Sequence, residues 1–219
     1  MSKLFAFVLV AVAAAVPAAH ARVHSIPVFQ TLEWPLVGEN PDFTARGVAI
    51  DGDSIIVLAD TSDQSPTTRM ALLYRRGTDQ RWAFSRILAQ VTAPRAELRS
   101  ELAMKNYLAA FKIHRDTAAT FWEKTGSNWV QAQVTNGVRG PGGFAISGSR
   151  IMVGQTGCDS DGLIYEKSGS GTWLITGQIA PDAGVCADQP RAVELNYDFA
   201  FIRHSPSLVR RRSRNWKSG

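Results

Sequence analysis

The residues best suited to carry chemistry lie in one short turn, Cys158-Asp159-Ser160-Asp161-Gly162. Two carboxylates at alternate positions, together with nearby backbone carbonyls, are ligands that Ca²⁺ accepts. A calcium loop also uses a further, bidentate carboxylate, which this turn does not provide. We therefore expect Asp159 and Asp161 to form a polar surface turn without a cofactor, and we take them as candidates for contacting a ligand.

Other catalytic and metal-binding patterns are missing from the sequence. The histidines that follow residue 21 are His24, His114 and His204, and no two of them have the spacing of metal ligands. The sequence contains no G-x-S-x-G nucleophile elbow, and neither cysteine has a convincing histidine partner. We expect no metal site and identify no catalytic residue, although a triad assembled only by folding would leave no such motif.

Residues 1–21 have the features of a signal peptide. Lys3 gives the charged start, Leu4–Val16 the apolar region, and Ala19-His20-Ala21 a cleavage site of small residues. No other stretch approaches the roughly 20 apolar residues that a membrane-spanning helix needs. We expect an exported chain, secreted or periplasmic, that begins near Arg22 and has no membrane span.

The net charge of the chain is +5, and the position of this charge matters more than its size. The residues after Asp198 include no acid and six bases: Arg203, Arg210, Arg211, Arg212, Arg214 and Lys217. A basic cluster at one end of a chain is more typical of a solvated extremity than of a nucleic-acid site. We therefore expect no nucleic-acid partner.

The two cysteines, Cys158 and Cys186, could form one disulfide, because exported proteins fold in an oxidising compartment. The alternative is two unpaired thiols in loops. Cysteine number and compartment leave both interpretations open.

The stretch Gly143–Ile179 predicts four short strands separated by turns of Gly, Ser and Asp: Phe144–Ser147, Arg150–Gly154, Gly162–Lys167 and Trp173–Ile179. An aromatic residue lies eight positions before a tryptophan at Tyr74 and Trp82, at Phe121 and Trp129, and at Tyr165 and Trp173. These tryptophans and Trp216 recur at spacings of 47, 44 and 43 residues. A unit of about 40 to 45 residues therefore repeats along the chain.

A four-stranded unit of this length is typical of one blade of a β-propeller. A single blade has two apolar faces and cannot bury them alone, so blades stack and the repeated Trp and Tyr residues fill the space between them. We predict an all-β fold, a β-propeller or partial propeller built from four-stranded antiparallel blades. A sugar-stacking platform is the alternative for one or two of the aromatic residues.

The stretches GVAIDGDSIIVLA and GFAISGSRIMVGQ, the strands LLYRR and LIYEK, and the endings GTDQRW, KTGSNW and SGSGTW resemble the FG-GAP repeat. This is the integrin-α-like propeller blade of exported bacterial proteins, and the resemblance covers most of Gly47–Ile179. The integrin-type calcium loop is absent, because Asp51-Gly52-Asp53-Ser54 is a simple hairpin turn. The resemblance therefore implies the propeller fold but not its calcium.

We divide the chain into a signal peptide (1–21), an N-terminal segment (22–46), three blades (47–90, 91–134 and 135–180) and a partial fourth blade with a basic tail (181–219). The fourth copy stops before its outer strand, and a strand at Ile26–Leu36 could supply it and close a four-bladed ring. The alternative is a shortened member of a larger-propeller family. An open ring would expose an apolar face and strand edges, which promote self-association.

In propeller topology, the loop with Cys158 and the linker with Cys186 open on the same rim, which favours their disulfide. The same rim carries the carboxylates that we take as candidate ligand contacts, Asp60, Asp63, Asp159 and Asp161. We expect a binding or structural module whose partner is a protein or a glycan. The alternative is a carbohydrate-active hydrolase or lyase, which would need two rim carboxylates about 5 to 10 Å apart.

Overall fold

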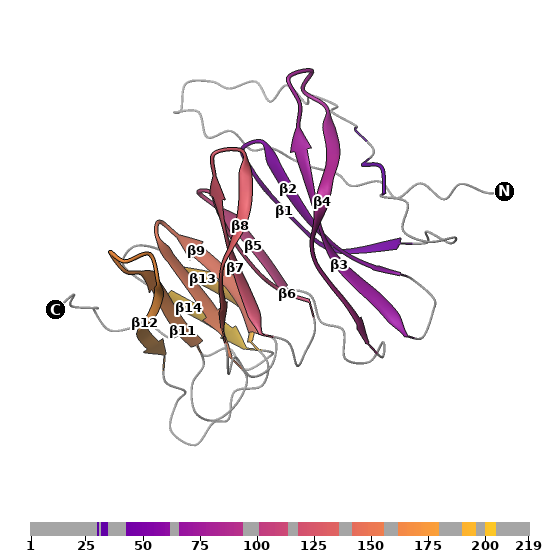
Figure 1. Cartoon of the computed structure of the whole chain (residues 1–219). Coiled ribbons are helices and arrows are strands. Elements are labelled where there is room, and N and C mark those ends of the chain that lie inside the picture. Colours follow the sequence, from indigo (N-terminus) through magenta and orange to yellow (C-terminus); the bar gives the residue numbers. More distant parts are fainter. Residues whose placement is uncertain are drawn as a thin grey trace, which may run out of the picture.

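The computed structural model describes residues 30, 32–34, 43–61, 66–93, 101–113, 118–135, 142–155, 162–179, 190–195 and 200–204. Every regular element in these ranges is a β-strand, and the strands form three four-stranded sheets and one two-stranded sheet (Figure 1). All pairings are antiparallel. The predicted fold class is confirmed: the chain is all-β, with sheets consistent with the blades of a partial propeller.

Each sheet is built from strands that are consecutive in the sequence, and we call the four sheets blades 1 to 4. Blade 1 contains β1 (Phe43–Asp51), β2 (Ser54–Thr61), β3 (Thr67–Arg76) and β4 (Trp82–Ala93). Blade 2 contains β5 (Glu101–Lys105), β6 (Leu108–Lys112), β7 (Ala119–Thr125) and β8 (Asn128–Thr135). Blade 3 contains β9 (Gly142–Ser147), β10 (Arg150–Gly154), β11 (Gly162–Lys167) and β12 (Trp173–Ile179), and blade 4 contains β13 (Pro190–Leu195) and β14 (Ala200–His204).

The blades follow one another in an arc. The first strands β1, β5, β9 and β13 contact each other in chain order, so each blade presents its first strand to the same side of the molecule. Blade 1 lies at one end of the arc and blade 4 at the other, beyond blade 3 (Figure 1). Blade 4 approaches blade 3 at Gly143, where an added Cβ would lie 2.7 Å from Cγ2 of Val193. Only glycine leaves room for this contact.

Apolar side chains fill the spaces between the blades, as the sequence predicts. Between blades 2 and 3, the ring of Phe121 meets the edges or faces of Tyr165 and Trp173 at centroid distances of 5.1 and 5.5 Å. Between blades 1 and 2, Trp129 packs with Leu58 and other buried residues of both sheets. Burial of each such side chain stabilises the fold by about 2 to 3 kcal/mol.

The indole nitrogens fix how neighbouring blades align. Nε1 of Trp129 donates a hydrogen bond to Oγ of Ser54 in blade 1 (3.1 Å), and Nε1 of Trp173 donates to Oε1 of Glu123 in blade 2 (2.9 Å). Each tryptophan therefore buries its ring between two blades and satisfies its polar group on the preceding blade. Because a buried N–H without an acceptor is costly, these bonds favour one alignment of the sheets.

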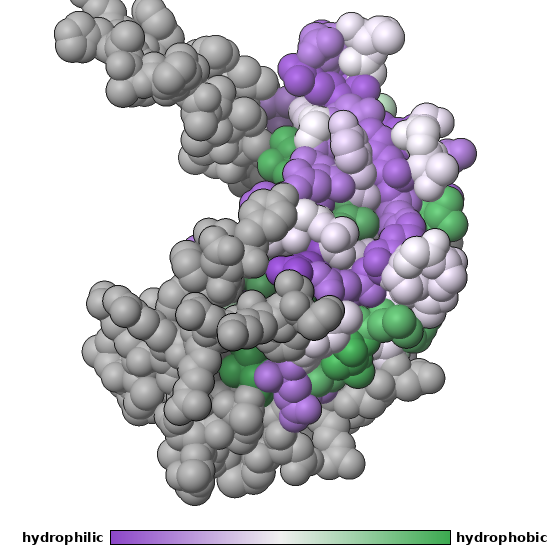
Figure 2. All heavy atoms as spheres, turned by 90° about the vertical axis from the view of Figure 1, so that its left-hand side faces the viewer, coloured by the Kyte–Doolittle hydropathy of each residue, from purple (hydrophilic) through white to green (hydrophobic). Residues whose placement is uncertain are grey.

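The surface of the arc carries both hydrophilic and apolar side chains. Figure 2 views the blade 3 and blade 4 end and shows apolar side chains in separate groups among hydrophilic ones. On β12, Leu174 and Ile175 are about half exposed (51% and 57%). Within the described part of the chain, no helix has the length and apolar character needed to cross a membrane.

Candidate functional site

Asp60 is the one of the four predicted rim carboxylates that the structure describes. It lies near the end of β2, directly opposite Arg69 on β3, and both side chains are almost fully buried. Its carboxylate accepts hydrogen bonds from Nε and Nη2 of Arg69 and from Nε of Arg46. Nη1 of Arg69 also donates to the carbonyl oxygen of Ile113 in blade 2 (3.4 Å). Asp60 thus links β2 to β1 and β3, and its partner Arg69 links blade 1 to blade 2.

The other predicted site residues, Asp63, Asp159, Asp161, Cys158 and Cys186, lie outside the described residues, and their roles stay predictions. The assignment of Asp60 as a ligand contact also stays a prediction. Among the described ranges, no group of three His, Cys, Asp or Glu residues is placed to hold a metal ion.

A different candidate site lies on the opposite side of the blades, at the hairpin turn between β5 and β6. Asn106 and Tyr107 form this turn, and both have positive φ (53° and 65°). The Tyr107 side chain is 61% exposed, the most exposed large hydrophobic residue among those described. The matching turns of blades 1 and 3 have glycine, Gly52 and Gly148, at the position of Asn106, and have Asp53 and Ser149 at the position of Tyr107. Of these three turns, the turn of blade 2 is the one with an aromatic residue, and it has positive φ at both turn positions.

Tyrosine in this conformation costs about 1 kcal/mol or more relative to glycine, so other contacts must hold it. The backbone N–H of Tyr107 donates to Oδ2 of Asp51 in blade 1 (2.8 Å), and its carbonyl oxygen accepts from the backbone N–H of Lys124 (2.8 Å). Nζ of Lys124 lies 5.5 Å from the centre of the Tyr107 ring, within the range of a cation–π interaction. The turn is therefore fixed from two blades.

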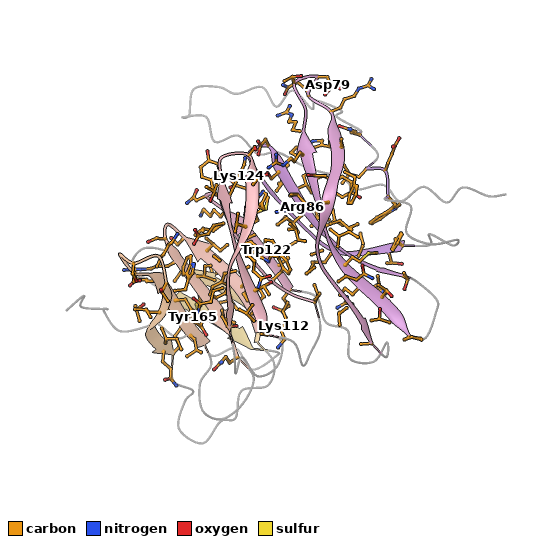
Figure 3. All side chains as sticks on the ribbon, viewed as in Figure 1. Asp79, Arg86, Lys112, Trp122, Lys124 and Tyr165 are labelled. Atoms are coloured by element: carbon orange, nitrogen blue, oxygen red, sulfur yellow. The ribbon has the colours of Figure 1, made fainter. Side chains whose placement is uncertain are left out.

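Lys124 also connects the turn to a second carboxylate. Its ammonium group donates to Oδ1 of Asp53, and the Lys124 side chain is only 9% exposed. Figure 3 labels Lys124 on blade 2. The hydrogen bond from Lys124 lowers the pKa of Asp53 below its ordinary value of 3.8, against the opposing effect of partial burial. Asp53 is therefore ionised at neutral pH. We call Asp51, Asp53, Tyr107 and Lys124 the Tyr107 patch.

The Tyr107 patch has the chemistry of recognition. An exposed aromatic ring can stack on the C–H face of a sugar or on an apolar side chain, and the flanking carboxylates and ammonium can accept and donate hydrogen bonds. Its four side chains include no thiol, hydroxyl nucleophile with a base, or paired carboxylic acid and carboxylate. The patch is thus suited to binding.

Tyr107 is not among the site residues predicted from the sequence, although the sequence contains a signal for it. The aligned turns read Asp51-Gly52-Asp53-Ser54, Lys105-Asn106-Tyr107-Leu108 and Ser147-Gly148-Ser149-Arg150. Two-residue hairpin turns favour glycine and asparagine because they need positive φ, so tyrosine at the second turn position is unusual. A residue that departs from the local turn preference in this way is a candidate for a functional role.

Comparison with known proteins adds no relative: the chain matches no family model, and a search among curated proteins finds no similar sequence. The fold alone therefore defines the class of this protein. The protein is a β-rich chain of repeated four-stranded antiparallel sheets that pack as propeller-like blades.

Proposed function

We propose that the protein is an exported binding module built from FG-GAP-like blades, and that it binds a glycan or a protein at the Tyr107 patch. The observation that carries this proposal is Tyr107 itself, an aromatic ring that is 61% exposed on a turn with unfavourable φ. Backbone strain is kept where the residue serves a purpose other than stability.

The scaffold supports this role because it holds the ring still. Asp51 and Lys124 fix the turn from two neighbouring blades, so little conformational entropy is lost when a ligand stacks on the ring. A glycan is the first candidate ligand, because an aromatic face flanked by charged hydrogen-bonding groups matches the apolar face and hydroxyl groups of a sugar. A protein ligand would use the same ring as an anchor.

The alternative function, a carbohydrate-active hydrolase or lyase, has less support. General acid catalysis needs a carboxyl group free to exchange a proton with the substrate. Asp60 is instead saturated by two guanidinium groups, and Asp53 is bonded to an ammonium group. These contacts disfavour Asp60 and Asp53 as general acids, and the other candidates, Asp63, Asp159 and Asp161, lie outside the described residues.

The proposal is tested with a glycan array and with pull-downs from periplasmic extract, using the purified chain and its Tyr107→Gly variant. We expect the variant to bind at least about 30-fold more weakly, the effect of losing an interface anchor. Its free energy of unfolding should stay equal or rise by about 0.5 to 1 kcal/mol, because glycine adopts positive φ without strain. Weaker binding therefore cannot result from unfolding.

A matched control is Leu174→Ala, which removes an exposed apolar side chain of β12 far from the turn and should leave binding unchanged. Tyr107→Phe keeps the ring and should retain most of the affinity. Equal binding by the original chain and Tyr107→Gly would remove the patch from the proposal. No binding in either assay would contradict the proposed function as a whole.

A further inference from the structure

Asp53 directs one carboxylate oxygen into the protein and leaves the other open. Its Oδ1 accepts a hydrogen bond from Oγ of Ser54 (2.9 Å) and a second one from Nζ of Lys124. Ser54 is fully buried and the Lys124 side chain is only 9% exposed, so both donors lie on the protein side of the carboxylate. The Asp53 side chain is half exposed, and its Oδ2 accepts no hydrogen bond from the described part of the chain.

The packing between blades 1 and 2 fixes this orientation of Asp53. Oγ of Ser54 accepts a hydrogen bond from Nε1 of Trp129 (3.1 Å), which is buried in the cluster between the two blades. A hydroxyl group has a single proton, and Ser54 gives that proton to Asp53. A chain of hydrogen bonds that begins in the core therefore holds the carboxylate, and its open oxygen is in position before a ligand binds.

Asp51 has the same arrangement next to Tyr107. Its Oδ2 accepts from the backbone N–H of Tyr107 (2.8 Å), whereas its Oδ1 accepts no hydrogen bond from any described residue. Asp51 is partly exposed, and it is separated from Asp53 by Gly52 alone. The Tyr107 patch thus combines an exposed aromatic ring with two open carboxylate oxygens, both from the turn of blade 1.

The carboxylate that pairs with a lysine between blades 2 and 3 is arranged differently. Oε1 of Glu123 accepts from Nε1 of Trp173 (2.9 Å), and Oε2 accepts from Nζ of Lys167. Each of its oxygens therefore already has a donor from the protein. The β9–β10 turn at this boundary has Ser149 at the position of Tyr107, so it offers no ring. Among the described turns of blades 1 to 3, open carboxylate oxygens and an exposed ring coincide only between blades 1 and 2.

The charges of the patch restrict the class of its ligand. An anionic ligand would be repelled, because the exposed charged groups of the patch are carboxylates and Lys124 is buried beneath them. A cationic group stacked on the ring would be repelled by the Lys124 ammonium, which lies 5.5 Å from the ring centre. Asp53 already interacts with the positive charges of Lys124 and Arg75. A neutral ligand with hydroxyl donors meets neither repulsion.

We infer that the Tyr107 patch binds a neutral sugar, whose C–H face stacks on Tyr107 while two of its hydroxyl groups donate to Oδ1 of Asp51 and Oδ2 of Asp53. This inference rests on the proposed function and narrows its ligand to one class. Hydrogen bonds from hydroxyl groups to carboxylates are charge-assisted, and they are stronger than bonds between neutral groups. An apolar surface with a few fixed polar groups is the usual design of a small-ligand site.

An array with three classes of oligosaccharide tests the inference on the purified chain. The probes are neutral oligomers of glucose, galactose and mannose, cationic oligomers of glucosamine, and anionic oligomers of galacturonic acid. We expect the strongest binding to a neutral oligomer, with an affinity that changes less than about twofold between about 0.05 and about 0.5 M NaCl, because no ion pair forms with the ligand. Strongest binding to a charged class, or no binding to any class, would overturn the inference. In either case the pull-down with Tyr107→Gly still decides whether the patch is a binding site.

Asp51→Asn isolates the hydroxyl contact. The amide oxygen can still accept from the Tyr107 N–H, so the turn keeps its support, while the outward atom becomes an N–H₂ group that cannot accept from a hydroxyl. We expect titration calorimetry with the neutral oligomer to show about tenfold weaker binding. Asp53→Asn should act in the same direction. The matched control is Glu166→Gln, which changes a partly exposed carboxylate of blade 3 that pairs with Arg150 and should leave the affinity unchanged.

The variants separate this inference from the proposed function. If Tyr107→Gly weakens binding and neither asparagine variant does, the patch binds the oligomer without its carboxylates and the inference is wrong. If none of the three variants weakens binding, the patch is not the site and both proposals fail. Urea unfolding of Asp51→Asn should match that of the original chain, so that weaker binding reports the lost contact. Equal weakening by Glu166→Gln would also overturn the inference.

Discussion

The two boundaries between the complete blades are built differently. Between blades 2 and 3, three aromatic rings from Phe121, Tyr165 and Trp173 pack in edge-to-face contacts, and Glu123 adds polar contacts to Trp173 and Lys167 at one end. Between blades 1 and 2, polar networks close the boundary at both ends of the strands. Arg69, paired with Asp60, reaches Ile113 at one end, and Asp53 holds Lys124 at the other.

This difference separates stability from recognition. Aromatic packing is buried and cannot contact a ligand, whereas the polar networks hold charged groups and one exposed ring at defined positions. The boundary between blades 1 and 2 also carries Tyr107, whose turn needs support from the neighbouring blade. The polar boundary is therefore where we place function, and the aromatic boundary is where we expect the larger contribution to stability.

The largest expected effect concerns the aromatic boundary. Phe121 is fully buried, and Phe121→Ala should lower the free energy of unfolding by about 3 to 5 kcal/mol, through lost burial and the cavity it leaves. Phe111→Ala is the matched variant, because Phe111 is equally buried but meets one ring, that of Trp122 in its own blade. Phe111→Ala should lower the free energy of unfolding by about 1 kcal/mol less than Phe121→Ala does. Urea unfolding measures both, and a larger loss for Phe111→Ala would reverse the comparison.

The next effect concerns the buried ion pair at the polar boundary. Arg69→Met leaves Asp60 buried with only Arg46 as a partner, and should cost about 3 kcal/mol in urea unfolding. Arg46→Ala should cost less than about 1 kcal/mol, because the Arg46 side chain is 40% exposed. Combining Asp60→Leu with Arg69→Met should restore most of the loss. No recovery would show that the charges themselves stabilise this boundary.

The smallest effect concerns Asp53 and depends on pH. The lowered pKa of Asp53 stabilises the folded chain above the ordinary value of 3.8, and this contribution is lost as the pH falls through the folded-state pKa. Because Asp53 is 52% exposed, Asp53→Asn should cost less than about 1 kcal/mol at neutral pH. Thermal unfolding from neutral to acidic pH should show the difference shrink and disappear as the pH falls below 3.8 and through the folded-state pKa of Asp53. A difference that is constant with pH would exclude the ion pair as its cause.

Much of the fold could be predicted because it depends on local patterns. The strands β10, β11 and β12 have the bounds that the turns of Gly, Ser and Asp around Gly143–Ile179 predict. The eight-residue spacing of Tyr165 and Trp173 follows from a hairpin that brings both side chains to one face, and both are buried between blades 2 and 3. Alternation and turn composition are properties of neighbouring residues, so they can be recognised without a structure.

The candidate site could not be predicted in the same way. Asp60 looked like a free rim carboxylate because Arg46 and Arg69 become its partners only through the register of β1, β2 and β3. The Tyr107 patch joins the turn of blade 2 to Asp51 and Asp53 of blade 1, more than fifty residues earlier. Contacts of this range depend on how blades stack.

By itself, the sequence determined the strands, the repeat and the aromatic residues that lie between blades, since each follows from periodicity and turn chemistry over a few residues. The tertiary structure alone decided which charges are buried, which ring is exposed, and that residues 30 and 32–34 lie against blade 1. Those outcomes depend on distances between segments far apart in the chain, and burial and electrostatic pairing are set by such distances. The pattern of residues specifies the blades, and their packing creates the site.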